Sequence, residues 1–505
     1  MTVVREVDPR TAAEGGRTRL TWWSLLSVVL ALPVWWFVAV SGVMTRALDG
    51  GIFLSVVGGL QQGLPLYSGV WDNKDPLFFG AMLAAATVSR AGPFVMDWLW
   101  IPVGALGAWL VARPLMSGDR ALFAGLVAAP LVLTGSYYIP GWASTPGTAV
   151  LLLALGLLMS RLGVGAGVVL GLLAFVKLVV WPIGVAALVA MLLVPDVRRV
   201  AIRGLIALAA TIAGGIGALA ALGWAAGYAE ALNRNRTYSG AVMTYFGFED
   251  SPLGHLRKMA EEWETVNWLG VVAVLVIALV MTVVLVSRPA WRSPARLVLG
   301  LWLWLAVIGT GALLALTYVW PHHAQAVYLP AVLSVIALLA MIPDGWPILV
   351  AVAISGVSVW LGAGAGGPVT VIDRFVAARA DFSARWADQD DVPTDARLLL
   401  MVPQPEFTLA RLGSNDDGGF LRDAPSGARL ACAQFHLYDF SPPEDFERML
   451  ECIKDVDSVL LTDGFVAFGN GGRAASVQPI LQYVDYAFDC VRVGDRQLCS
   501  REPGL

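Results

Sequence analysis

Apolar runs recur along most of this 505-residue chain, and short turns that contain arginine separate many of them. With 57% hydrophobic and only 14% charged residues, the chain is too apolar for a soluble protein of this length. The sequence therefore predicts an α-helical polytopic membrane protein with about eleven transmembrane helices, although several runs are shorter than the roughly 20 residues of a straight span. The runs cover residues 20–44, 94–112, 121–137, 146–160, 164–179, 181–194, 205–224, 268–287, 297–318, 327–342 and 346–362.

The basic residues predict how these helices are oriented. Arginines precede the first run and lie in several later turns, and basic residues of this kind are typical of cytoplasmic loops. They are Arg5, Arg10, Arg17 and Arg19 in the tail and Arg113, Arg120, Arg161, Arg198, Arg199, Arg203, Arg288, Arg292 and Arg296 in the turns. We therefore expect a cytoplasmic tail at residues 1–19, a membrane domain at 20–363 and, after an odd number of spans, an extracytoplasmic domain at 364–505.

Two loops of the membrane domain are expected on the outer side. The first covers residues 45–93 and contains two short apolar segments, 50–62 and 76–90, which we expect to form helices along the membrane interface. The second covers residues 227–267 and is polar enough and long enough to cover a site.

The last part of the chain has the composition of a small α/β domain. Residues 371–386 and 443–453 have helical character, 397–402 and 458–461 have strand character, and the final residues predict a hairpin.

All four cysteines lie in this domain, so disulfides and an oxidising compartment are expected. Three pairings are open, and we favour Cys490–Cys499, which flanks the hairpin, together with Cys432–Cys452. Four reduced cysteines on a cytoplasmic domain are the alternative.

Charged residues gather in the first external loop, next to hydrocarbon, where they are costly and indicate a functional site. Asp49 lies a few residues beyond the first run, and Asp72, Lys74 and Asp75 stand just before the second short apolar segment. Lys177 is costly for the same reason. If Trp181-Pro182 breaks the helix there, Lys177 could lie at the outer edge of the membrane and contact a lipid phosphate or its tail.

This loop resembles the first external loop of the GT-C glycosyltransferases, integral-membrane enzymes that use sugars linked to a lipid phosphate. The shared features are an aspartate beyond the first span (Asp49), a Gly-x-x-Leu-Tyr segment that ends at Tyr67, and Trp-Asp-Asn-Lys-Asp-Pro-Leu at residues 71–77. The loop is most similar to the branch of protein O-mannosyltransferases and the lipid A aminoarabinose transferase, where Lys-Pro-Pro-Leu is usual. Here Asp75 replaces the first proline of that motif.

A second resemblance lies near the end of the membrane region. Residues 318–330, which include His322 and His323, are similar to a loop before a late helix in bacterial members of the superfamily. The second acidic motif of the superfamily has no counterpart, because residues 138–146 contain no carboxylate.

The resemblance implies a sugar transfer in which Asp49 is the general base that takes the proton of the acceptor hydroxyl. It also implies that Lys74 binds the donor phosphate. Residues placed near the phosphate by their position in the second loop are Arg234, Arg236, Arg257 and Lys258. Residues expected to bind acceptor or substrate are Tyr67, Asp72, Asp75, His322 and His323. Asp72 could also hold a divalent cation such as Mg²⁺ or Mn²⁺.

The expected donor is a mannose- or arabinofuranose-like sugar on a polyprenyl phosphate. The expected acceptor is a glycan, lipid or protein of the cell envelope at the outer face of the plasma membrane, and no nucleic acid is expected. The strong excess of arginine over lysine, with the richness in Ala, Val and Gly, indicates a high-GC bacterium and suggests an actinobacterial envelope.

Simpler roles remain open for the same residues. Asp49 could cap the helix expected from residue 50, Lys74 could be an interfacial lysine that reaches to water, and the two histidines could be ring donors at a helix mouth. For the whole chain, a transporter or lipid flippase is the main alternative, and it would show repeated halves and charges at the midplane. A membrane-anchored envelope-assembly protein, acting through its C-terminal domain, is another.

Overall fold

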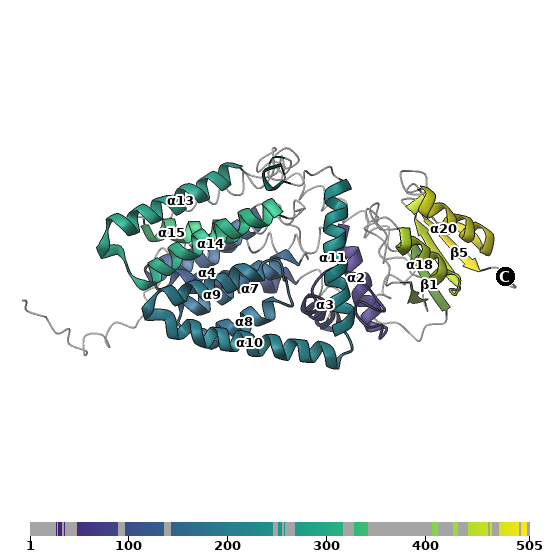
Figure 1. The fold of residues 1–505 in the computed structure, drawn as a ribbon, viewed down its shortest axis with the longest axis horizontal. Helices are drawn as coiled ribbons and strands as arrows, with labels where there is room; N and C mark the ends of the chain where they lie inside the picture. Colours follow the sequence, from purple (N-terminus) through teal and green to yellow (C-terminus); the bar gives the residue numbers. More distant parts are fainter. Residues whose placement is uncertain are drawn as a thin grey trace, which may run out of the picture.

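The computed structural model consists of a helical body followed by a small domain with a β-sheet (Figure 1). It describes residues 48–88, 96–135, 143–245, 251–254, 257, 268–316, 328–341, 407–412, 428–432, 443–462, 465–466, 474–493 and 496–501, with isolated positions between 27 and 35. The elements expected at 346–362, 371–386 and 397–402, and most of the first run, lie outside these residues.

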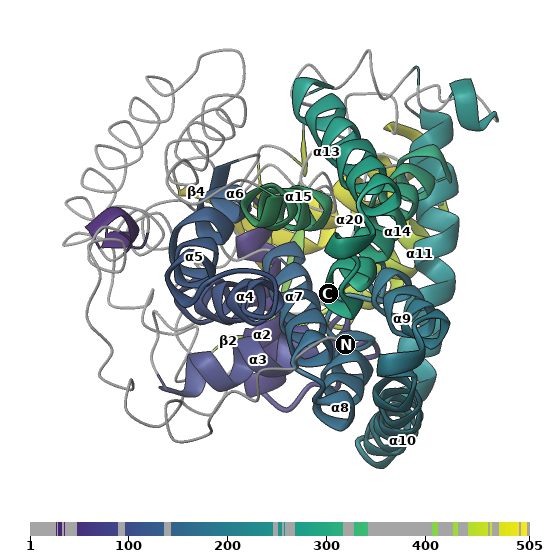
Figure 2. The same cartoon turned by 90° about the vertical axis from the view of Figure 1, so that its left-hand side faces the viewer.

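The helical body is built from helices that run side by side (Figures 1 and 2). They are α4 (Asp97–Ala112), α5 (Gly118–Phe123), α6 (Ala129–Gly135), α7 (Ser144–Met159), α8 (Gly163–Leu173), α9 (Trp181–Ala190), α10 (Arg198–Ala221), α13 (Trp268–Ser287), α14 (Pro294–Leu316) and α15 (Tyr328–Met341). A π-helical turn, η2 (Ala124–Ala128), joins α5 to α6. The positions of the predicted runs are largely confirmed, and α13 has the predicted limits.

The run at 164–179 is shorter as a helix than predicted. α8 ends at Leu173, residues 174–180 form turns, and α9 begins at Trp181. The two helices are therefore separated just before Trp181-Pro182, the condition under which Lys177 was considered for a place at the edge of the membrane. Pro182 has no N–H to donate and suits the first turn of a new helix, where that group would have no helical partner.

Glycines allow the closest helix contacts of the body. A Cβ atom on Gly107 of α4 would overlap the backbone of Leu152 in α7, and one on Gly156 of α7 would lie 2.6 Å from the carbonyl oxygen of Gly107. Helices in membranes gain their contacts from such close approach of small residues. The α4–α7 pair is therefore fixed by backbone proximity.

Apolar side chains cover the outside of the helical body as well as its interior. Ile206 on α10, Val286 on α13 and Ile308 on α14 are 66%, 67% and 61% exposed. In the described part of the chain, Pro195–Ala221 and Pro294–Ala312 are long and apolar enough to cross a membrane, and seven shorter apolar helices accompany them. This surface suits contact with lipid, as expected for a polytopic membrane protein, while the count of about eleven spans stays a prediction.

Three helices lie at one end of the body, between it and the C-terminal domain (Figure 1). They are α2 (Leu48–Gln61), α3 (Pro76–Val88) and α11 (Ala225–Tyr245). α2 and α3 correspond to the short segments predicted at 50–62 and 76–90, and at 14 and 13 residues they are too short to span. α11 was not predicted. It replaces the first half of the expected loop at 227–267 with a 21-residue helix.

The C-terminal domain contains a five-stranded sheet with the order β2-β1-β3-β5-β4. The strands are β1 (Phe407–Leu412), β2 (Ala428–Ala431), β3 (Ser458–Thr462), β4 (Phe488–Val493) and β5 (Arg496–Arg501). β1 pairs in parallel with β2 and β3, whereas β5 pairs antiparallel with β3 and β4. Helices α18 (Pro443–Ile453) and α20 (Ala474–Ala487) supply much of the hydrophobic core through Phe446, Val477 and Ile480. The predicted helix at 443–453, strand at 458–461 and final hairpin are confirmed.

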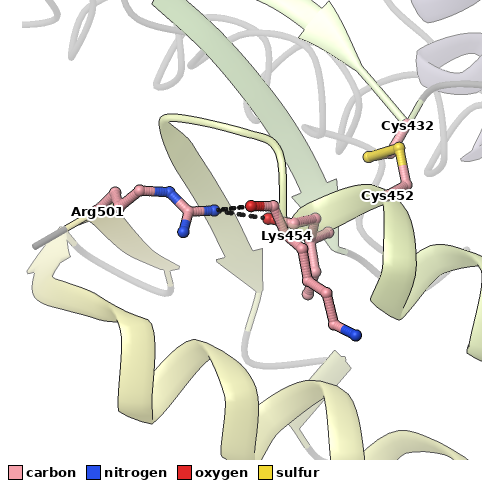
Figure 3. Close-up of a disulfide and its surroundings, with 5 residues drawn as sticks. Cys432, Cys452, Lys454 and Arg501 are labelled. Carbon is pink, nitrogen blue, oxygen red and sulfur yellow. Dashed lines mark hydrogen bonds between the residues drawn. A yellow bond between two sulfur atoms is a disulfide. The ribbon is translucent and has the colours of Figure 1, made fainter. Parts of the chain in front are cut away.

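Both favoured disulfides are present. Cys432 is bonded to Cys452, and Cys490 is bonded to Cys499, which lies directly opposite in the β4–β5 hairpin. Figure 3 shows the first bond beside the end of α18. At this helix end Arg501 donates from Nη2 to the carbonyl oxygens of Ile453 and Lys454 at 3.1 and 2.6 Å. Its Nε donates to the carbonyl oxygen of Val456 at 2.9 Å.

Candidate functional site

The polar loop between α2 and α3 folds against itself. Tyr67 has a positive φ of 72°, which is uncommon for a residue other than glycine, and its N–H donates to the carbonyl oxygen of Val70 at 2.6 Å. The Tyr67 hydroxyl donates to the carbonyl oxygen of Lys74 at 2.8 Å. Gly69 is required for this turn, because a Cβ atom there would lie 2.6 Å from the ring of Pro65. The loop therefore has a defined shape that ends at Lys74.

Asp75 joins this loop to two distant segments. Its side chain is buried, with Oδ1 accepting from the Tyr228 hydroxyl at 2.7 Å and Oδ2 accepting from the N–H of Leu178 at 2.9 Å. The N–H of Leu77 donates to the carbonyl oxygen of Phe175 at 2.8 Å. Residues 75–77 are thus bound both to α11 and to the turn between α8 and α9.

Burial controls the protonation of this group. It raises the pKa of Asp75, and the hydrogen bonds from Tyr228 and Leu178 and the charges of Lys177 and Lys74 act in the opposite direction. Burial and the nearby Asp75 carboxylate raise the pKa of Tyr228, so its hydroxyl keeps its proton and donates. Burial likewise raises the pKa of Tyr67. Both tyrosines are therefore hydrogen-bond donors at any physiological pH.

Lys74 is held in place by its neighbours in the loop. Its N–H donates to Oδ1 of Asp72 at 2.9 Å, and its ammonium lies 3.6 Å from the same oxygen. The ammonium also donates to Oδ1 of Asn73 and lies 5.2 Å from the ring centroid of Phe53 in α2. The Lys74 side chain is only 15% exposed. A lysine with these contacts is a fixed cation rather than one that extends freely into water.

α11 lies along this loop. The ring of Tyr228 lies 5.4 Å from that of Tyr67, measured between centroids, and Nδ2 of Asn235 donates to the carbonyl oxygen of Asn73 at 3.0 Å. Tyr228 and Asn235 are seven residues apart and so lie on one face of the helix, two turns apart. α11 therefore holds the loop at two points.

Arg234 connects α11 to the C-terminal domain. Its guanidinium lies 2.7 Å from Oε1 of Glu230, 4.0 Å from Oδ1 of Asp445 in α18, and 6.0 Å from the ring centroid of Trp71. Burial raises the pKa of Asp445, and the charge of Arg234 lowers it. Two carboxylates already accompany Arg234, and its predicted contact with a phosphate stays a prediction.

The structure describes less of the other predicted site residues. Asp49 is the second residue of α2, but its side chain lies outside the described residues. Arg236 on α11 and Arg257 are exposed. Lys258, His322 and His323 lie outside the described residues. Among the residues that the structure describes, no group of three or more His, Cys, Asp or Glu could hold a metal ion.

The structure adds residues to the site that the sequence did not identify. Tyr228 and Asn235 were part of a segment expected to be a loop, and their seven-residue spacing is the feature that could have indicated a helix face. Lys177, considered from the sequence as a possible contact to a lipid phosphate or its tail, is 8% exposed and lies in the turn that contacts Asp75 and Leu77.

No protein-family model and no curated protein matches the sequence. Among solved structures, the chain is similar to the archaeal oligosaccharyltransferase AglB from Archaeoglobus fulgidus, determined in complex with an inhibitory peptide and a dolichol-phosphate. That match has a TM-score of 0.45 and 12% identity, and it covers 96% of this chain and 75% of AglB.

The chain is also similar to ArnT from Cupriavidus metallidurans, determined bound to undecaprenyl phosphate. This match has a TM-score of 0.53 and 13% identity, and it covers 95% of this chain and 98% of ArnT. The likeness therefore extends over nearly the whole of both chains. The chain has the fold of ArnT.

Proposed function

We propose that this protein is a membrane glycosyltransferase that moves a sugar from a polyprenyl-phosphate donor to a cell-envelope acceptor. The observation that carries the proposal is the near-complete fold likeness to ArnT, whose structure contains undecaprenyl phosphate. The fixed Lys74 cation, at the end of the helical body, supports it further. A fold alone does not define a reaction, so the site residues must supply the chemistry.

In the proposed reaction, the acceptor oxygen attacks the anomeric carbon of the sugar with inversion. The bond from that carbon to the phosphate oxygen breaks, and polyprenyl phosphate leaves with the bonding electrons. Lys74 stabilises the departing phosphate as a compact cation. Arg236, Arg257 and Lys258 are proposed to add positive charge.

Asp49 is proposed to take the proton from the acceptor hydroxyl as the sugar is transferred. It lies four residues before Phe53 in α2, and residues with this spacing share one face of a helix. The ring of Phe53 is the one that the Lys74 ammonium contacts. The proposed base and the proposed phosphate ligand therefore belong to neighbouring positions at the same end of the molecule.

The expected orientation places this end outside the cell. The connection before α10, with Arg198 and Arg199, lies at the end of the helical body opposite α11 (Figure 1). The turn with Arg161 lies there too, because a Cβ atom on Gly163 would overlap the backbone of Val200. Basic turns at that end support a cytoplasmic location for it. The disulfide-bonded C-terminal domain is then extracytoplasmic, where disulfides persist.

Sugar transfer can be measured directly with the full chain in nanodiscs. The donor is polyprenyl phosphate that carries labelled mannose or arabinofuranose, and an actinobacterial envelope fraction supplies the acceptor. We expect transfer by the wild type and a loss on the order of 100- to 10,000-fold in Asp49→Asn, the contribution typical of a general base. The matched control is Asp196→Asn, an exposed aspartate just before α10, which we expect to leave transfer unchanged.

The same preparation tests the competing functions. Movement of labelled lipid across the bilayer without sugar transfer would support a flippase and reject the proposal. Full transfer by Asp49→Asn would keep the glycosyltransferase but reject Asp49 as the base.

A further inference from the structure

We propose that Lys177 is a second cation of the donor-phosphate site and acts together with Lys74. This inference rests on the proposed function and deepens it, because it assigns a phosphate ligand on the turn between α8 and α9. The ligand chemistry is a phosphate ester on a lipid headgroup.

Two hydrogen bonds bind the turn around Lys177 to the Lys74 loop: Leu77 N–H donates to the Phe175 carbonyl oxygen at 2.8 Å, and Leu178 N–H donates to the Asp75 carboxylate at 2.9 Å. These contacts involve residues on both sides of Lys177 and the residues that follow Lys74. The two lysines therefore belong to one structural unit, although they are far apart in the sequence.

The Lys177 side chain packs against a glycine of α7. A Cβ atom on Gly147, in the first turn of α7, would lie 2.6 Å from Cβ and 2.9 Å from Cγ of Lys177. The aliphatic stem of Lys177 therefore packs directly on the backbone of α7. Lys177 is only 8% exposed, and a lysine kept at such a place in a membrane protein is costly and indicates function.

Asp75 interacts electrostatically with both Lys74 and Lys177, and both of its oxygens are already engaged by Leu178 and Tyr228. The carboxylate is thus a fixed group that both lysines share.

The reaction itself requires charge of this kind. A sugar-linked polyprenyl phosphate is a phosphodiester with one negative charge, whereas the departing polyprenyl phosphate is a monoester with up to two. Cations already in place where this charge develops stabilise the transition state without reorganisation. A second lysine beside Lys74 would stabilise the additional negative charge on the departing phosphate.

Binding of polyprenyl phosphate to the full chain in nanodiscs tests the inference. Because a hydrogen bond to a charged group contributes about 1.5–3 kcal/mol, Lys177→Met should weaken binding by about tenfold or more. Lys177→Arg should retain part of the affinity. The matched control is Lys454→Met in the C-terminal domain, whose ammonium pairs with Glu451 at an exposed site and should not affect binding.

A double variant distinguishes a Lys177 that binds the phosphate from a Lys177 that only balances the charge of Asp75. If Lys177 only balances Asp75, then Asp75→Asn combined with Lys177→Met should restore the affinity that Lys177→Met loses, and this result would overturn the inference. If Lys177 contacts the phosphate, the double variant should bind as weakly as Lys177→Met or more weakly. Thermal unfolding of each variant shows whether the fold is retained.

Competition identifies the source of the phosphate. Polyprenyl phosphate should bind in nanodiscs of phosphatidylglycerol, and millimolar inorganic phosphate should not displace it. Displacement by inorganic phosphate, or saturation by phosphatidylglycerol alone, would overturn the assignment to a polyprenyl headgroup. A wild type that does not bind polyprenyl phosphate would reject the proposed function, whereas normal binding by Lys177→Met would reject only the role of Lys177.

Discussion

Asp75 in the helical body and Arg501 in the C-terminal domain both connect distant segments by hydrogen bonds. Asp75 accepts these bonds, whereas Arg501 donates them. Asp75 is a buried acceptor that binds donors 103 and 153 residues away. Arg501 is a partly exposed donor that binds carbonyl oxygens 45 to 48 residues away, at the end of α18 (Figure 3). A helix end presents unpaired carbonyls that an arginine can satisfy, so Arg501 needs no role beyond the fold.

Asp75 needs a different explanation. A buried carboxylate costs free energy even when it is hydrogen-bonded, and apolar packing could have joined the same segments. Asp75 instead stands next to Lys74 and interacts with Lys177. Arg501 thus serves the fold, whereas Asp75 also fits the role that we propose, in which it positions the two lysines.

The largest effect is expected from Asp75→Ala. This change leaves the Tyr228 hydroxyl and the Leu178 N–H without their acceptor inside the protein, and breaking one partner of a buried charged contact costs about 3–5 kcal/mol. Hydrogen exchange of the full chain should accelerate in α3 and in the first half of α11. Exchange in α18 should stay as in the wild type, and an equal acceleration there would show that the two regions are not independent.

Arg501→Met should have the next largest effect, at about 2 kcal/mol, because it removes charged hydrogen bonds to three carbonyls that water can partly replace. Hydrogen exchange should accelerate in α18 and leave α3 unchanged. Lys454→Met is the control, since Arg501 binds its carbonyl oxygen and its own ammonium makes only an exposed pair with Glu451. Acceleration of exchange in α3 would contradict a purely local role.

The elements that could be predicted are those whose signal lies within a short stretch of the sequence. The apolar segment of α13 and the amphipathic α18 have the predicted limits, and Cys490 and Cys499 flank a hairpin turn that the sequence itself indicates. Lys74 and Asp75 were identified by the same means, because their charges stand out next to apolar segments.

The rest of the site depends on contacts between distant segments. α11 has a polar composition that is typical of a loop, and it contacts the site through Tyr228 and Asn235, whose partners are 153 and 162 residues away. The end of α8 at Leu173 was missed because the apolar run continues through the turn, so hydropathy does not change where the helix does. No local pattern connects Lys177 to Asp75.

Tyr228→Phe should produce a smaller effect than either change above. It removes one hydrogen bond to Asp75 but keeps the ring contact with Tyr67, so the expected loss of stability is about 1–2 kcal/mol. The position of the loop determines the position of Lys74, which we propose binds the donor phosphate. The KM for the lipid donor should therefore rise more than kcat falls. Tyr486→Phe, at a residue that is 69% exposed, is the control. An unchanged KM would indicate that Asp75 holds the loop through Leu178 alone.

The smallest effect is expected at the contact between the two regions. Arg234 and Asp445 lie 4.0 Å apart, with side chains that are 29% and 21% exposed, and pairs of this kind contribute about 0.2–1 kcal/mol. Asp445→Asn should therefore change the melting temperature little, and the change should shrink further in high salt. Arg234→Met should cost more than Asp445→Asn, because it also removes the Glu230 pair and the contact with Trp71. If Asp445→Asn instead slowed sugar transfer strongly while leaving stability intact, the C-terminal domain would act on the Lys74 loop through Arg234, and the two regions would be one functional unit.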